Sequence, residues 1–167
     1  LSCADSRVPP EMVFNVGLGE LFIIRTAGQV TDKAVLASIE YAAEHLKVPL
    51  LVVMGHDSCG AVKAAIETKA GAPSMGPNLD ALVRSIKPAF ERMSTSADLD
   101  HLRDAVLANV EEVVNSVLTS STIVKHLVGN GTLQMVAAFY EFDTGRVRFS
   151  KPASPGPVPI PPKRRSS

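Results

Sequence analysis

The sequence predicts an α/β fold in which helices flank a mostly parallel central β-sheet. Three observations lead to this prediction. Residues 50–55 form a short continuous apolar run, which is typical of a strand buried on both faces of a parallel sheet. Segments with apolar residues at helical spacing alternate with such runs along the chain. Near the carboxyl end, Asp143-Thr144-Gly145 separates two strand-like segments and predicts a hairpin.

The first part of the chain supplies the other predicted strand and two helices. Residues 20–27 are predicted to form a strand. Residues 32–46 have the pattern of an amphipathic helix, capped by Thr31 or Asp32. Residues 60–67 are predicted to form the second helix, directly after the apolar run.

The second part of the chain continues the alternation. A Gly- and Pro-rich loop at residues 71–77 precedes a predicted helix at about residues 79–93. Residues 98–118 carry apolar side chains at helical spacing, which indicates core packing. Residues 133–142 and 146–149 are the predicted strands of the hairpin.

The composition of the chain changes abruptly after Ser150. We expect one domain over residues 1–150, because a chain of 167 residues is of one-domain size. Residues 151–167 consist mainly of Pro, Ser and basic residues and are predicted to be a disordered tail.

The charge and hydropathy of the chain argue against two classes of partner. Residues 1–150 carry 13 basic and 17 acidic residues, and such a balance is not that of a nucleic-acid-binding surface. No stretch of eighteen apolar residues occurs, so we expect no transmembrane helix and no membrane partner.

Two short clusters together supply two thiolates and one imidazole. Cys3 lies at the start of the chain, and His56 and Cys59 are three residues apart in the turn that follows the apolar run. Structural zinc sites normally have four protein ligands, whereas catalytic sites keep three and leave one position open. The pattern therefore predicts a catalytic zinc site. Taken singly, the cysteines could equally be buried small residues or a disulfide, and the histidine a buried polar residue.

The turn that carries His56 and Cys59 lies where α/β proteins bind ligands. In open α/β sheets, ligands bind outside the carboxyl ends of the strands, and the N-terminus of a helix favours an anion there. We therefore expect this turn to suit a small oxyanion.

Several motifs, in the same order, carry a resemblance to a known family. They are residues 3–11, 19–28, 38–43 and 55–62, and the similarity continues to about residue 149. This set resembles the β-class carbonic anhydrases. The resemblance implies a β-carbonic anhydrase-like fold with the hairpin at the edge of the sheet. It also implies a zinc lyase that reversibly hydrates CO2 to bicarbonate and a proton by zinc-bound hydroxide.

The resemblance assigns roles to the residues of both clusters. Cys3, His56 and Cys59 match the ligands of Zn²⁺ in the family, and Asp5 and Arg7 match its catalytic dyad. Asp5 would accept a hydrogen bond from the nucleophile, and Arg7 would keep that carboxylate ionised. The alternative is that Asp5 and Arg7 form a structural ion pair.

The resemblance also implies a substrate pocket. Phe22, Ala27 and Tyr41 match residues that line it, some of them reaching in from a neighbouring subunit, and Gly60 matches a backbone donor near the substrate. Ordinary core packing is the alternative for Phe22.

The resemblance leaves open the oligomeric state, the position of Asp5 and the exact reaction of this chain. Family members form homodimers or homotetramers, and Asp5 could leave Arg7 and become a fourth zinc ligand. The absence of Trp favours the form in which Asp5 stays away from the metal. Two alternative functions remain. The same ligands could serve the hydrolysis of carbon disulfide or carbonyl sulfide, or the chain could be an inactive zinc-binding module.

The chain begins only two residues before Cys3. By comparison with the family, we expect a fragment that lacks a preceding strand, the helices before it and one glutamine of the active site. Such a fragment should be weakly stable, because apolar surface and sheet edges would be exposed. A cytoplasmic location is the default expectation, which a signal peptide ahead of Leu1 would change.

Overall fold

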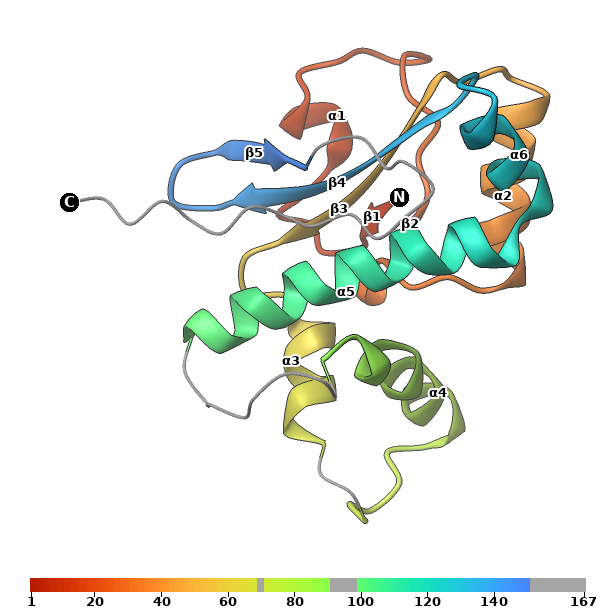
Figure 1. The fold of residues 1–167 in the computed structure, drawn as a ribbon. Helices are drawn as coiled ribbons and strands as arrows, with labels where there is room; N and C mark the ends of the chain where they lie inside the picture. Colours follow the sequence, from red (N-terminus) through yellow and green to blue (C-terminus); the bar gives the residue numbers. More distant parts are fainter. Residues whose placement is uncertain (69–70, 91–98, 151–167) are drawn as a thin grey trace.

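The computed structural model describes residues 1–68, 71–90 and 99–150 of the chain. These residues form a five-stranded sheet with the order β2-β1-β3-β4-β5 (Figure 1). The first four strands are parallel, and the last is antiparallel to its neighbour. Their bounds are β1 Ser2–Cys3, β2 Arg25–Thr26, β3 Leu50–His56, β4 Gln134–Glu141 and β5 Arg146–Phe149. The sheet confirms the predicted fold class, including the hairpin at its edge.

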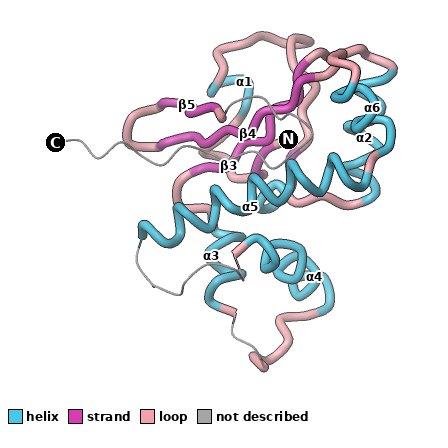
Figure 2. Tube along the Cα trace, in the orientation of Figure 1, coloured by secondary structure: helices cyan, strands magenta, loops and turns pink. Residues whose placement is uncertain are grey.

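Helices pack against this sheet (Figures 1 and 2). The helical elements are α1 Pro10–Val13, η1 Ala27–Gln29, α2 Lys33–Glu44, α3 Gly60–Glu67, α4 Pro77–Ile86, η2 Lys87–Ala89, α5 Leu99–Ser120 and α6 Thr122–Gly129. One apolar cluster joins α2, α5 and α6 to β3 and β4. A second joins α3, α4 and α5 to β4 and to the loop after β1. The long helix α5 takes part in both clusters and therefore ties them together.

Strand β3, an interior strand of seven residues, becomes more buried toward its carboxyl end. It pairs with β4 from Leu50 opposite Gln134 to His56 opposite Tyr140. Its first residue is exposed, and its last four residues are buried. The strand ends one residue later than predicted and includes His56.

Helix α5 lies unusually close to β3 just before His56. A Cβ atom at Gly55 would be 2.7 Å from both Val106 Cγ1 and Val110 Cγ2. Since real Cβ atoms essentially never approach so closely, only glycine allows this contact between strand and helix. The helix is thereby held against the strand end that carries His56.

The predicted strand at residues 20–27 is mostly wrong. Only Arg25 and Thr26 form a strand, because β1 offers just Ser2 and Cys3 as partners. Two hydrogen bonds extend this pairing, from Ser2 N to Ile24 O and from Ala4 N to Thr26 O.

The predicted helix at residues 32–46 is confirmed with a more definite start. Asp32 caps it, because its carboxylate accepts a hydrogen bond from Val35 N. Thr31 does not cap it. The helix predicted at residues 60–67 has the predicted bounds.

The helix predicted at residues 79–93 is shorter at its end. The α-helix runs from Pro77 to Ile86, and a 3₁₀ turn follows. Pro88 explains the end, because a proline has no amide hydrogen and cannot donate the next α-helical hydrogen bond, to the carbonyl of Arg84. Residues 91–93, like the predicted tail at 151–167, lie outside the described residues.

Two short helices were not predicted. Helix α1 has only four residues, and α6 begins after Ser121, whose side chain accepts a hydrogen bond from Val124 N. Among the described helices, none is long and apolar enough to cross a membrane.

Candidate metal centre

Three potential metal ligands meet at the carboxyl edge of the sheet. Cys3 ends β1, His56 ends the neighbouring parallel strand β3, and Cys59 immediately precedes α3. Their ligand atoms all lie within 4.8 Å of one another, and the three residues are buried. The structure therefore brings together the three residues that the sequence proposed as ligands.

The hydrogen bonding of His56 leaves one ring nitrogen ready for a metal. Its Nδ1 lies 2.8 Å from the carbonyl oxygen of Asp57. A carbonyl only accepts, so Nδ1 carries the proton and Nε2 carries the free lone pair. Nε2 is buried and has no hydrogen-bond partner among the described residues. A buried lone pair of this kind, facing two thiols, fits a bound zinc ion.

The two cysteines are free thiols and form no disulfide. Hydrogen bonds from Cys59 and from the Gly28 amide favour the Cys3 thiolate and lower the pKa of Cys3 to about 4. The contact with Cys3 and burial raise the pKa of Cys59. One thiolate therefore forms readily, and a dication favours loss of the second proton.

The backbone around Gly28 fits closely against Cys3. The Gly28 amide lies 3.4 Å from Cys3 Sγ, and its carbonyl accepts a hydrogen bond from Asn109 Nδ2 at 2.9 Å. Gly28 has a φ of +70°, and a Cβ atom there would lie 3.0 Å from Ile86 Cδ1. The positive φ favours glycine, and a side chain here would also crowd Ile86.

Asp5 and Arg7 form a two-pronged ion pair beside the ligands. Asp5 Oδ1 accepts from Arg7 Nε at 3.0 Å and from Arg7 N at 2.9 Å, and Oδ2 accepts from Nη2 at 2.7 Å. These hydrogen bonds hold the pKa of Asp5 well below its usual range. Asp5 is thus ionised at neutral pH and held by Arg7. Arg7 Nη2 also lies 3.4 Å from the carbonyl oxygen of Ser58, which links the pair to the turn of His56 and Cys59.

Sequence reasoning missed Arg25 as part of this site. Its Nε donates to Cys3 O at 2.9 Å, and its Nη2 donates to Asp5 O at 2.6 Å. It thereby fixes the backbone on both sides of Ala4. The sequence did contain one sign of this role, because Arg25 is a charged residue directly after the apolar run 21–24.

Ala27 and Gly60, which were predicted to bind substrate, lie close to the proposed metal ligands in the structure. Ala27 follows Thr26, the β-sheet partner of Cys3, and Gly60 is the first residue of α3 after Cys59. The first N–H groups of a helix have no acceptor within the helix, and nothing lies within 4 Å of a Cβ built at Gly60. The position of Gly60 is thus open to a ligand.

Phe22 and Tyr41, the other predicted pocket residues, are exposed near an apolar groove. Their ring centroids are 6.2 Å apart, and the side chains are 42% and 51% exposed. Phe22 lines a cavity of about 270 Å³ together with Leu1, Phe14 and Leu50. Phe22 is therefore not a core residue of this single chain, and the alternative of ordinary core packing is wrong here. That Phe22 and Tyr41 contact the substrate stays a prediction.

Comparison with known proteins adds an independent finding. Residues 1–147 match the family model described as carbonic anhydrase. Carbonic anhydrase 2 of Mycobacterium tuberculosis is 40% identical over 144 residues, which are 86% of this chain and 69% of that protein.

Solved structures agree with the match. The β-carbonic anhydrase of Coccomyxa, in complex with acetazolamide, is 29% identical, with a TM-score of 0.80 over 91% of this chain and 71% of that one. One of two tetrameric β-carbonic anhydrases of Sordaria macrospora is similar in fold, with 24% identity and a TM-score of 0.78 over 89% and 77% of the two chains.

Proposed function

Because the chain belongs to the β-class carbonic anhydrase family, we propose that its metal centre catalyses the reversible hydration of CO2 to bicarbonate and a proton. The observation that carries this proposal is the buried Cys3, His56 and Cys59 group beside the Asp5 and Arg7 pair. Nothing in the described residues favours hydrolysis of carbon disulfide or carbonyl sulfide, or an inactive module.

Zinc is the metal we propose for this centre. Two sulfur ligands and one imidazole nitrogen are typical of zinc sites, and three protein ligands leave one coordination position for the reaction. When bound, zinc would lower the pKa of a water ligand and supply hydroxide near neutral pH. Cys3, His56 Nε2 and Cys59 would hold it.

Asp5 would orient the nucleophile without taking its proton. Because Arg7 lowers its pKa so far, the carboxylate is a weak base and serves as a hydrogen-bond acceptor. Its Oδ2 accepts one hydrogen bond from Arg7 and keeps room for another from an O–H group. An O–H group held in this way would have its oxygen free to react with the carbon of CO2, and the proton released by the reaction would pass to the solvent. The backbone amide of Gly60, at the start of α3, would donate to an oxygen of the bicarbonate.

We also propose that the active form is a homodimer or a larger homo-oligomer. The apolar groove and the exposed Phe22, Tyr41 and Leu50 leave a contiguous apolar surface that a second copy would cover. The Sordaria enzyme that shares the fold is one of two described as tetrameric.

The function is tested by stopped-flow CO2 hydration with protein of measured zinc content. We expect turnover far above that of protein stripped of zinc by a chelator, restored when zinc is returned. Zinc-loaded, folded protein without CO2 hydration would overturn the proposed activity, and carbon disulfide and carbonyl sulfide would then be assayed on the same sample.

A further inference from the structure

The turn that joins His56 to Cys59 is held in an unfavourable backbone conformation. Ser58, in the middle of this turn, has a φ of +55°, although it is not glycine. A residue with a side chain keeps such a conformation only when surrounding contacts hold it. The spacing of the two ligands therefore depends on whatever holds this turn.

Asp57 provides the contacts that hold the turn. Its amide donates to Tyr140 O at 3.1 Å, and its Oδ2 accepts from the Phe142 amide at 3.0 Å. Its Oδ1 accepts from Arg103 Nη1 at 3.3 Å. The carboxylate thus ties the turn to the end of β4 on one side and to helix α5 on the other.

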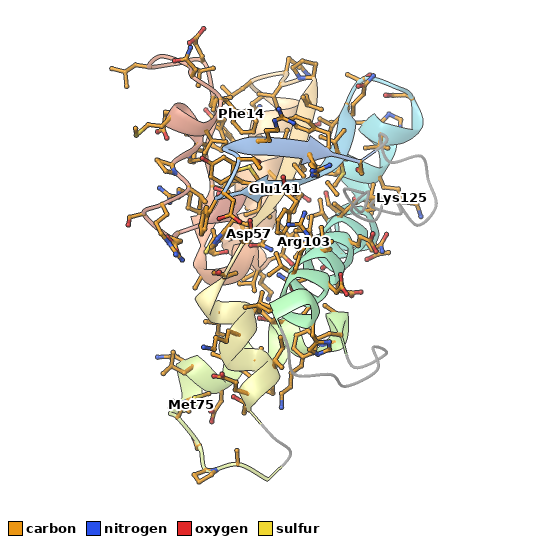
Figure 3. The ribbon with its side chains drawn as sticks, turned by 90° about the vertical axis from the view of Figure 1, so that its left-hand side faces the viewer. Phe14, Asp57, Met75, Arg103, Lys125 and Glu141 are labelled. Carbon is orange, nitrogen blue, oxygen red and sulfur yellow. The ribbon has the colours of Figure 1, made fainter. Side chains whose placement is uncertain are left out.

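Arg103 is itself fixed in place. Its Nη2 donates to Glu141 Oε1 at 2.7 Å, and its guanidinium lies 4.3 Å from the centre of the Phe139 ring. The side chain is only 15% exposed. Figure 3 shows Asp57, Arg103 and Glu141 gathered where the turn, α5 and β4 meet. An arginine held on two sides in this way can act as a rigid anchor for a third group.

A second arginine shares Glu141, and within the described residues its side-chain hydrogen bonds go to Glu141 and not to the turn. Arg148 Nε donates to Glu141 Oε1 at 2.8 Å, and Arg148 is 45% exposed. Removal of Arg103 therefore leaves Glu141 paired with Arg148, and removal of Arg148 leaves the contact between Arg103 and Asp57. The two arginines form a matched pair for experiment.

We propose that Arg103 is a positioning residue of the metal centre, which acts through Asp57 to keep His56 and Cys59 at the spacing that zinc requires. This inference rests on the proposed zinc site. Residues that orient metal ligands typically change metal affinity or activity by about 10- to 100-fold when they are removed. Arg103 acts through one intermediate residue, so we expect an effect near the lower limit.

The test compares Arg103→Met with Arg148→Met in zinc-loaded protein. We expect zinc release to a chromogenic chelator to become about 10-fold faster in Arg103→Met and to stay as in the unchanged protein in Arg148→Met. Arg103→Lys should restore part of the retention, because lysine keeps the charge but not the two-pronged geometry. The absorption bands of the cobalt-substituted protein should shift in Arg103→Met alone, since they report ligand geometry.

Thermal melting of the zinc-free variants separates positioning from folding. Equal melting temperatures with unequal zinc release support the proposal. If Arg103→Met does not fold, Asp57→Asn provides the test, because it weakens the same contact and leaves the pair of Arg103 and Glu141 in place. Fast zinc release from Asp57→Asn then supports the proposal, and unchanged release overturns it.

Two results contradict different claims. Equal zinc release from Arg103→Met and Arg148→Met, with normal zinc binding and turnover in the unchanged protein, overturns the role of Arg103 alone. An unchanged protein that binds no zinc overturns both the proposed function and this inference.

Discussion

At its amino end, β3 begins with Leu50, which is 46% exposed beside the apolar groove, whereas at its carboxyl end it delivers His56, which is 1% exposed. The carboxyl end is surrounded by hydrogen bonds and ion pairs from the same chain. The amino end faces a cavity lined mainly by apolar side chains. A single chain thus supplies the proposed metal ligands and the contacts that hold them, while its apolar end stays exposed. The two regions should respond differently to mutation.

The largest effect is expected from removal of a ligand. In Cys59→Ser we expect zinc binding to be lost and CO2 hydration to fall by about 10³-fold, since a catalytic metal contributes several kcal/mol. Zinc per chain, measured by atomic absorption, and stopped-flow rates check this. Lys63→Ala, a change of an exposed residue on α3, is the control. Full zinc content in Cys59→Ser would show that Cys59 is not a ligand.

The next effect concerns catalysis with the metal still bound. In Asp5→Asn we expect kcat to fall by about 100-fold, because an amide cannot orient an O–H donor in the same way as a carboxylate. Zinc content should stay the same, because the three proposed ligands are intact. Ser6→Ala serves as the neighbouring control. Unchanged kcat in fully zinc-loaded Asp5→Asn would contradict the assigned role.

A charge placed at the apolar end should affect association and leave the metal centre intact. We expect Leu50→Glu to weaken self-association by about 10-fold or more, because burying an unpaired carboxylate is costly. Sedimentation equilibrium measures this effect, and zinc per chain should not change. Leu79→Glu is the matched control, since Leu79 is 53% exposed on α4 and does not line the groove. Equal association in both variants would argue against a dimer interface at the groove.

The smallest effect is a dependence of stability on pH that arises from Glu141. Arg148 and Arg103 lower the pKa of Glu141 to about 2, against about 4.3 in an unfolded chain. The ionised carboxylate therefore stabilises the fold above about pH 4.3, and this stabilisation is lost as the pH falls toward 2. Because Arg148 is half exposed, we expect only about 1–2 kcal/mol.

Urea unfolding of zinc-free protein at pH 6 and pH 3 measures that contribution. Glu141→Gln should be less stable than the unchanged protein at pH 6, and the difference should shrink at pH 3. A difference that is the same at both pH values would show that Glu141 does not contribute through its charge.

Two of the three proposed metal ligands could be predicted from the sequence because their signal is local, whereas Cys3 lies about fifty residues away and matches a ligand by resemblance to the family. His56 and Cys59 lie three residues apart directly after an apolar run, so one short turn can bring both side chains to the same site. The sheet and its helices could be predicted for the same reason, since periodicity and turn residues are local properties.

The contacts that hold the site could not be predicted, because they join distant parts of the chain. Arg103 contacts Asp57 across 46 positions, and Asn109 contacts Gly28 across 81. Nothing in the sequence distinguishes Arg103 from other charged residues of a helix. The length of β2 was also not predictable, because it depends on how many residues its partner β1 offers.

The separation of the ligands along the chain has a consequence for the order of events during synthesis. Cys3 is made before its partners at 56 and 59, which follow about fifty residues later, and Glu141, which anchors Arg103, comes a further 82 residues on. A ribosome that adds about 5–20 residues per second needs roughly ten seconds to extend the chain from Cys3 to Glu141. The proposed zinc site can therefore be complete only after Glu141 has been made, and the thiol of Cys3 lacks its two partners until residues 56 and 59 have followed.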